Sequence, residues 1–173
     1  ACAMAAHVTA SPNHQTHRTT PLKFRFDVAM SGRLGFELHP KGMTTNEIAF
    51  AKKAVADYKR LRPVIQQGDL YRLVSPWENN YAALMTVNDD KTQAVVFLYG
   101  LNRGIMSDFP APLMLQGLDP ARRYTLTELN KEKRDHSRVN GKALSGAALM
   151  AMGLPVKLEG DYDSAVFELS AAR

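Results

Sequence analysis

Residues 44–76, TTNEIAFAKKAVADYKRLRPVIQQGDLYRLVSP, constrain the fold of this chain most, because a long amphipathic helix there passes directly into a β-strand. Thr44 and Glu47 have capping-box spacing, in which each side chain binds a free amide of the first turn. Pro63 predicts that the helix ends or kinks just before it, and Gly68 predicts a left-handed C-cap. Apolar residues at three- and four-residue steps predict one buried face: Phe50, Ala51, Ala54, Val55, Tyr58, Leu61 and Ile65.

The composition is that of a globular protein. The chain has 173 residues, of which 45% are hydrophobic and 23% charged, so it has room for one ordinary domain or for a small domain with part of another. No apolar run approaches the roughly 20 residues that cross a bilayer, so we expect no membrane partner. The N-terminus lacks the basic region of a signal peptide, and a single cysteine, Cys2, excludes an intrachain disulfide. The chain is expected to be soluble, and its compartment, cytoplasmic or periplasmic, stays open.

The net charge of +5 is unevenly distributed along the chain. Residues 1–68 hold 10 Lys and Arg against 4 Asp and Glu, whereas residues 69–173 hold 12 against 13. The basic surplus lies in a segment without a nucleic-acid motif. We therefore expect a solvated or partner-covered surface and no nucleic-acid partner.

Residues 7–26, HVTASPNHQTHRTTPLKFRF, are punctuated by proline and asparagine and predict a long polar loop. His7, His14 and His17 are possible metal ligands, but no carboxylate and no cysteine other than Cys2 stands nearby. We therefore expect no metal, and polar side chains that bind the loop's own backbone or a sugar. A loop of this length is more often functional than decorative.

Downstream of this loop, residues 31–38, with glycines at 32 and 35, predict a buried strand; a loop and then the helix of 45–62 follow, which is one β-to-α unit. One such unit cannot bury itself, so we expect missing neighbours upstream. Residues 1–66 should accordingly be loosely attached, or pack their apolar helix face against a partner copy.

After residue 69 the sequence predicts β-strands. Runs at 71–74, 81–87, 93–99, 113–115, 124–129 and 164–169 alternate or are apolar, with turn residues between them, and predict an antiparallel sandwich. Asp89 and Asp90 are explained by turn chemistry. Residues 130–142 predict a solvated charged loop, residues 101–112 another loop, and residues 146–152 fit a helix or a strand equally well.

The run AHVTASPNHQTHRTTPLKFRFDVAMSGRLGFEL resembles the segment near the end of the catalytic barrel in bacterial α-galactosidases of glycoside hydrolase family 36, the melibiase type. That family has a similar G-A-H-V-S-x-x-P-N-H-Q-x-x-R-x-T-P-L signature. The likeness continues through FAKKAVADYKRLRPVIQQGDLYRLVSP and the tail runs GLDPARRYTLTEL, SGAALMAMGLPV and GDYDSAVFEL. Departures include Ala5 and His17 where the family commonly has glycine, Thr9 for serine and His39 for aspartate.

The resemblance implies an α+β fragment: the last strand and helix portion of a (β/α)8 barrel in residues 1–68, followed by a C-terminal antiparallel β-sandwich domain in residues 69–173. Family members are retaining hydrolases of terminal α-galactosyl residues, as in melibiose and raffinose-type sugars, and use two aspartates on earlier barrel strands. The family's K-W-D and S-D-D motifs do not occur here, and Asp27 is the only aspartate before the helix. We therefore expect no catalytic residue in this chain and no activity from it alone.

The resemblance also implies candidate site residues, because loops at the C-terminal ends of barrel strands build the active site. The candidates for lining or bracing the substrate pocket are His7, Asn13, His14, Gln15, Arg18 and Arg25. Asparagine and histidine offer both donor and acceptor to sugar hydroxyls, and the two arginines are suited to holding the loop by charge-assisted hydrogen bonds. Bracing is favoured over direct sugar contact.

The implied partners are α-galactosides bound by the full-length enzyme and the upstream catalytic barrel, which the β-domain would stabilise. The β-domain is also a candidate for homo-oligomer contacts, and no cofactor is implied. The alternative is a non-catalytic carbohydrate-binding or interaction module, in which Trp77, Tyr71, Tyr81 and Tyr99 would form a sugar-stacking platform. Core packing explains the tyrosines more simply, and Trp77 is expected to seal the barrel against the β-domain.

Overall fold

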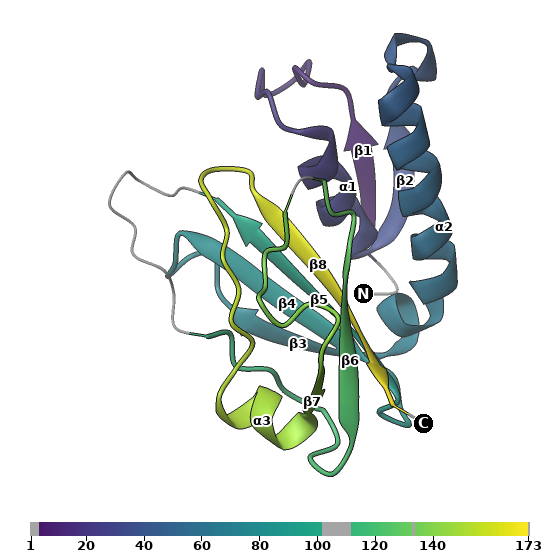
Figure 1. The fold of residues 1–173 in the computed structure, drawn as a ribbon. Coiled ribbons are helices and arrows are strands. Elements are labelled where there is room, and N and C mark those ends of the chain that lie inside the picture. The colour runs from purple at the N-terminus through teal and green to yellow at the C-terminus, as the bar shows by residue number, and fades with distance from the viewer. Residues whose placement is uncertain (1–3, 102–111, 133, 173) are drawn as a thin grey trace.

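The computed structural model describes residues 4–101, 112–132 and 134–172 (Figure 1). The predicted loop at 101–112 lies almost wholly outside the described residues. None of the helices in the described part has the length and hydropathy that crossing a membrane requires. The elements follow in the order β1 (Ala5–Thr9), α1 (Leu22–Met30), β2 (Arg33–Glu37), a 3₁₀ turn (Pro40–Gly42), α2 (Thr45–Gln67), β3 (Asp69–Val74), β4 (Tyr81–Val87), β5 (Gln93–Gly100), β6 (Arg123–Leu129), β7 (Ala143–Ser145), α3 (Gly146–Ala151) and β8 (Ser164–Ala171).

The strands in the described part of the chain form two sheets of different kinds. β1 and β2 pair in parallel, with Ala5 opposite Arg33 and Thr9 opposite Glu37. The other six strands form one antiparallel sheet in the order β3-β4-β5-β8-β6-β7. The hairpin predicted from the runs at 81–87 and 93–99 is confirmed as β4 and β5.

The expected β-sandwich is wrong in one respect, because the described strands after residue 68 belong to a single sheet. Segments that are not strands cover the face where a second sheet was expected. The predicted strand at 113–115 is only an isolated bridge from Leu113 to Leu154, and residues 146–151 form the helix α3. Leucines from these segments fill the core on that face: Leu113, Leu115, Leu118, Leu149, Leu154 and Leu158.

The helix α2 is confirmed, including its capping box: Glu47 N donates to Thr44 Oγ1 at 3.3 Å and Thr44 N to Glu47 Oε2 at 2.8 Å. The end expected at Pro63 is wrong, whereas Gly68 is the C-cap as predicted. The helix continues past Pro63 to Gln67, because Pro63 lies on the exposed side while the residues after it add to the buried face. Gly68 is extended, not left-handed (φ −67°, ψ 162°).

The two faces of the large sheet each carry a core, and β5 contributes to both. Val95, Phe97 and Tyr99 pack with α1 and α2, whereas the alternate residues Val96 and Leu98 pack on the α3 side. Figure 1 shows α1 and α2 on one side of the sheet and α3 on the other. The expectation that residues 1–66 are loosely attached is therefore wrong: their apolar helix faces are buried against the sheet of the same chain.

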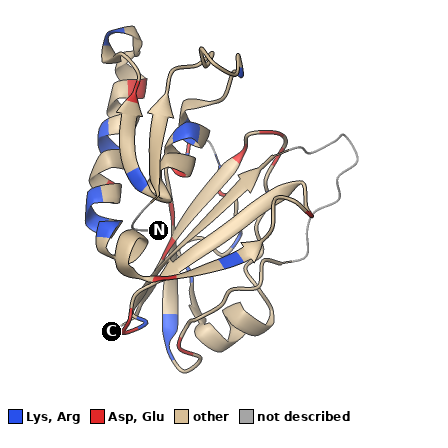
Figure 2. Ribbon diagram, turned by 180° about the vertical axis from the view of Figure 1, so that it is seen from behind, with Lys and Arg blue, Asp and Glu red and all other residues tan. Residues whose placement is uncertain are grey.

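The basic residues of α2 are all exposed, and Figure 2 shows their positions along the helix in blue. One of them also ties the helix to the sheet, since Arg60 donates to both carboxylate oxygens of Glu168 on β8, at 2.6 and 2.7 Å. Gln93 on β5 donates to the same carboxylate at 2.8 Å. Burial acts to raise the pKa of Glu168, but the bonds from Arg60 and Gln93 hold that pKa below its usual value.

Candidate functional site

The candidate site lies at the carboxyl ends of β1 and β2, which meet at one edge because the two strands are parallel. His7 Nδ1 and Glu37 Oε1 are 2.9 Å apart, and both side chains are partly exposed. The His7 ring lies against Gly35, its partner in the register; a Cβ atom at residue 35 would stand 2.3 Å from His7 Cδ2. Glycine at this position therefore makes room for the ring.

Glu37 was not among the predicted site residues. Residues two apart on a strand point to the same face, so Gly35 and Glu37 share the face of β2 that His7 lies against. The G-x-E spacing was visible in the sequence, but its importance depends on the pairing with β1. That pairing joins residues about 30 apart, which no local pattern indicates.

The segment between β1 and α1, residues 10–21, is a loop as predicted, and we call it the polar loop. The wider prediction of a loop over 7–26 is wrong at both ends, since residues 7–9 pair with β2 and residues 22–26 begin α1. The first end was missed because β1 pairs with β2, which is distant in sequence. The second belongs to α1, whose buried residues recur at three- and four-residue steps: Lys23, Phe26, Asp27, Ala29 and Met30.

Asn13 organises the polar loop. Its Oδ1 accepts from the backbone N of Gln15 at 3.0 Å and of Thr16 at 2.9 Å, and from Thr16 Oγ1 at 3.2 Å. Its own backbone N donates to the Arg18 carbonyl at 2.9 Å. His17 adopts a left-handed conformation (φ 55°), which glycine tolerates better than other residues.

His14, Gln15 and Arg18 are exposed on this loop, and the structure shows no side-chain hydrogen bond from them to any described residue. Arg25 lies behind the loop: its Nη1 donates to the carbonyl of Thr9 at the end of β1. Its Nε is buried without a hydrogen-bond partner in the described part of the chain. Burial lowers the pKa of Arg25, with Glu47 acting in the opposite direction.

The six predicted residues therefore divide by their contacts. Asn13 and Arg25 brace the backbone, and His7 is held by Glu37. His14, Gln15 and Arg18 point outward with free polar groups. Within residues 4–101, 112–132 and 134–172 no three His, Cys, Asp or Glu side chains come together as a metal-binding group.

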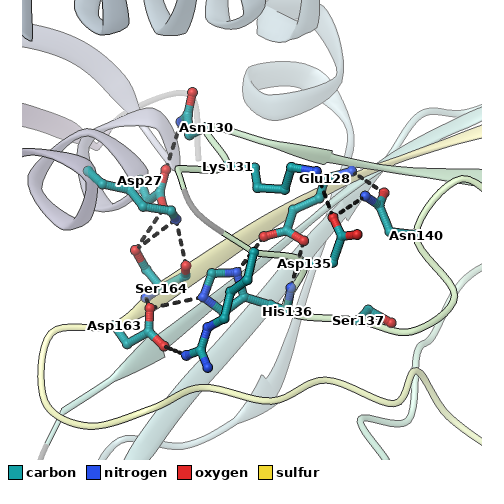
Figure 3. A network of polar contacts seen from close by, with 12 residues as sticks. Asp27, Glu128, Asn130, Lys131, Asp135, His136, Ser137, Asn140, Asp163 and Ser164 are labelled. Carbon is teal, nitrogen blue, oxygen red and sulfur yellow. Dashed lines mark hydrogen bonds and ion pairs between the residues drawn. The ribbon is translucent and has the colours of Figure 1, made fainter. Parts of the chain in front are cut away.

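Beneath the polar loop, α1 is joined to the large sheet through Asp27, which is fully buried (Figure 3). Lys23 Nζ donates to Asp27 Oδ2 at 2.5 Å and Ser164 Oγ to the same oxygen at 2.7 Å. Asn130 Nδ2 donates to Asp27 Oδ1 at 2.7 Å, and Tyr99 Oη to the Asp27 backbone carbonyl at 3.1 Å. The only aspartate before α2 is thus a buried and fully paired carboxylate.

A second buried group surrounds His136, where a solvated loop was predicted for residues 130–142 (Figure 3). That prediction is wrong for Asn130, His136 and Ser137, which are all buried. His136 Nδ1 lies 2.5 Å from Glu128 Oε1, and Nε2 lies 3.0 Å from Asp163 Oδ1. The imidazole ring occupies the space between these two carboxylates, so they do not stand across an open cleft from one another.

The charge state of His136 follows from these contacts. Burial acts to lower the pKa of His136, but hydrogen bonds with Asp163 and Glu128 outweigh it and raise this pKa to about 9. Burial likewise acts to raise the pKa of Asp163, and the bond with His136 holds that pKa below its usual value. His136 is therefore a cation near neutral pH, and it ties the 130–142 segment to β6 and to the start of β8.

The aromatic residues do not form one platform. Tyr99 is buried and faces α1, whereas the Tyr71 ring lies beside Gly117 on the α3 side of the sheet. Tyr81 is half-buried, and burial raises its pKa. Trp77 is 94% exposed, so it seals no junction within the described residues.

Two family models match this chain in tandem. The model described as Melibiase covers residues 1–68, and the model described as Glycosyl hydrolase family 36 C-terminal domain covers residues 81–169. Among curated proteins, the chain is 38% identical over 165 residues to Alpha-galactosidase 2 of Hypocrea jecorina, covering 95% of this chain and 20% of that protein. It is 41% identical over 145 residues to Alpha-galactosidase AgaA of Geobacillus stearothermophilus, covering 82% of this chain and 19% of that protein.

Solved structures agree in sequence and in fold. A variant of AgaA in complex with raffinose superposes with a TM-score of 0.87 at 34% identity, over 99% of this chain and 22% of that one. AgaB of the same organism superposes with a TM-score of 0.85 at 35% identity, over 99% of this chain and 22% of that one. This chain spans about a fifth of the length of the curated relatives it matches. The two models account for most of its residues, and the chain belongs to glycosyl hydrolase family 36.

Proposed function

We propose that this chain is the C-terminal portion of an α-galactosidase that hydrolyses terminal α-galactosyl residues, as in melibiose and raffinose-type sugars, with retention of configuration. The tandem match to the melibiase and C-terminal models, over about a fifth of the length of its relatives, carries the proposal. Retaining glycosidases need two carboxyl groups about 5 to 5.5 Å apart across the scissile bond. The buried, paired Asp27 is unsuited to that role, so both catalytic carboxylates are assigned to a preceding segment.

The geometry of residues 1–68 supports their assignment to a barrel. A parallel pair such as β1 and β2 needs further strands beside it, because parallel sheets occur with both faces covered. An apolar groove of about 370 Å³ also lies open along β2 and α2, lined by Phe36, Leu38, Pro40, Met43, Ile48, Ala51, Lys52 and Val55. We infer that residues 1–68 complete a (β/α)8 barrel and that residues 69–173 form the C-terminal domain.

The predicted site residues take two roles in this proposal. His14, Gln15 and Arg18 line the sugar pocket, because their polar groups are exposed beyond the ends of the parallel strands. His7 lines it as well, in an orientation that Glu37 holds. Asn13 and Arg25 brace the backbone that carries them.

A chimaera tests the proposal. The region of Geobacillus stearothermophilus AgaA that matches this chain is replaced by the chain itself, and turnover of nitrophenyl α-galactoside is measured. We expect the chimaera to be active, and the 173-residue chain alone to give no turnover under the same conditions. Turnover by the chain alone, comparable to that of AgaA, would show that the catalytic carboxylates have been misplaced. A chimaera that is folded and inert would refute the assignment to a barrel.

The exposure of Trp77 favours a second candidate function, a carbohydrate-binding module. A tryptophan on a turn, followed by Glu78, Asn79 and Asn80, offers a stacking surface with polar groups beside it. Because Trp77 is the only tryptophan, its fluorescence reports on this surface directly. A saturable change on titration with galactose would support the module, and an unchanged spectrum would count against it.

A further inference from the structure

Four side chains bind Asp27, in the middle of α1, and three of them come from distant parts of the sequence. Figure 3 shows Asn130 and Ser164 beside it. Tyr99 comes from β5 and Ser164 from the start of β8. Asn130 follows β6, and Lys23 lies one turn earlier on α1. Both carboxylate oxygens and the backbone carbonyl of this one residue are therefore bound, and of the four donors two belong to the antiparallel sheet while Asn130 directly follows β6.

These contacts are directional in a way that apolar packing is not. A buried carboxylate that loses a donor leaves a charge with an unsatisfied oxygen, which is costly at low dielectric. Lys23 Nζ adds a further tie to the sheet, because it also donates to the backbone carbonyl of Ser164 at 2.5 Å. These contacts therefore help to fix the position of α1 along and about its axis, together with the close-packed apolar core around Phe26, Ala29 and Met30.

The position of α1 in turn determines the polar loop. The loop leads directly into α1 at Leu22, so one of its ends moves with the helix. Arg25, two residues before Asp27, binds the carbonyl of Thr9, where β1 ends and the loop begins. Both ends of the polar loop are thus attached to α1.

We propose that Tyr99 and Ser164 of the C-terminal sheet, with Asn130 directly after β6, are positioning residues for the polar loop, acting through Asp27 and α1. The structural part stands on the contacts alone. That the loop so positioned lines a sugar pocket rests on the proposed function. The C-terminal domain would then set the shape of the substrate pocket in addition to covering the barrel.

Amide hydrogen exchange of the 173-residue chain tests the structural part. Asn13 and His17 donate their amides within the polar loop, so they report on its order. Ser164→Ala should speed exchange at both by about tenfold, with less than a twofold change in β4, since a hydrogen bond to a buried charge is lost. The matched control is Ser170→Ala on the same strand, whose Oγ binds Glu168 at 3.3 Å and which should leave the loop unchanged.

Two further, conservative variants distinguish displacement of the polar loop from general destabilisation of the fold. Tyr99→Phe keeps the buried ring and removes only the hydroxyl that binds the Asp27 carbonyl; it should speed loop exchange several-fold. Ser164→Thr keeps a hydroxyl and should restore most of the protection that Ser164→Ala removes. Equal acceleration in β4 and in the loop, or no acceleration in the loop for either Ser164→Ala or Tyr99→Phe, would overturn the proposal.

The functional part is measured separately in the active chimaera. Ser164→Ala should raise KM for nitrophenyl α-galactoside by about tenfold, because a displaced loop weakens sugar binding. A merely destabilised protein would lose active enzyme, which lowers apparent kcat and leaves KM unchanged. Faster loop exchange with an unchanged KM would overturn the link to the pocket, whereas an inert parent chimaera would refute the proposed function and leave the exchange result standing.

Discussion

Replacing His136 by glutamine should cost stability at pH 6 and cost much less at pH 10. His136 lies between Glu128 of β6 and Asp163, which immediately precedes β8, and its side chain is only 6% exposed. Arg134 faces the same group, with Nη2 3.6 Å from Asp163 Oδ2. The fold therefore stabilises the protonated side chain of His136 far more than the neutral one.

The magnitude follows from the pKa of His136, which rises from 6.5 to about 9 on folding. At 1.36 kcal/mol for each pH unit, this rise corresponds to about 3 kcal/mol of stability. Because the folded-state pKa is the higher one, the contribution is complete below pH 6.5 and is lost as the pH rises through about 9. The pKa of about 9 already includes the cost of burying the charged imidazolium, so the stabilisation of about 3 kcal/mol is a net contribution.

Urea unfolding, followed by circular dichroism, measures the effect. The free energy of unfolding of His136→Gln should lie about 3 kcal/mol below that of the unaltered chain at pH 6, and within about 1 kcal/mol of it at pH 10. Lysines and tyrosines titrate in both proteins, so their contribution cancels when the free energy of unfolding of the variant is subtracted from that of the unaltered chain at the same pH.

Ser137→Ala is the matched control for His136→Gln. It removes a buried hydrogen bond from the same segment, from Ser137 Oγ to the Pro155 carbonyl at 2.6 Å, and involves no titrating group. Its cost should be the same at both pH values. A His136→Gln deficit that is equally large at pH 6 and pH 10 would refute the assignment of a charged histidine.

Two other predictions concern the contacts of α2 with the sheet. Arg60→Gln removes the paired hydrogen bonds to Glu168 and should lower the free energy of unfolding by about 1 to 2 kcal/mol, whereas Lys53→Gln, in an exposed pair, should change it by less than about 0.5 kcal/mol in the same urea titration. Gly68→Ala should destabilise the fold by about 2 kcal/mol or more, because the new Cβ would lie 2.5 Å from the Val87 carbonyl oxygen. Gly42→Ala, with nothing within 4 Å of the new Cβ, should leave the thermal midpoint nearly unchanged, and equal losses at the two glycines would contradict this reasoning.

Local patterns predicted the elements whose contacts are local. The capping box of Thr44 and Glu47 and the apolar period of α2 lie within one helix, and the β4–β5 hairpin joins adjacent runs across a short turn. Asp90 likewise acts in that turn, where its Oδ1 accepts from Thr92 N at 3.2 Å. Each of these interactions spans only a few residues, so the spacing of residue types is enough to identify it.

Sequence patterns gave wrong predictions where the structure depends on contacts between residues that are distant in sequence. The number of sheets depended on which leucines cover the second face, and the course of α2 past Pro63 depended on burial gained beyond it. A charged-looking segment proved to be buried around His136, because Glu128 and Asp163 approach it from other elements. Glu37 joined the candidate site only through the pairing of β2 with β1.

From its residues alone, this chain reveals its family, its helix, most of its strands and the polar loop, because these depend on motifs and periods that are contiguous in sequence. The tertiary structure alone decided that one sheet serves both cores and that Asp27 is held by Tyr99, Asn130 and Ser164. Those contacts join residues between 72 and 137 positions apart. Buried charges are stabilised by whichever donors the fold brings to them, and sequence spacing carries no record of that arrangement.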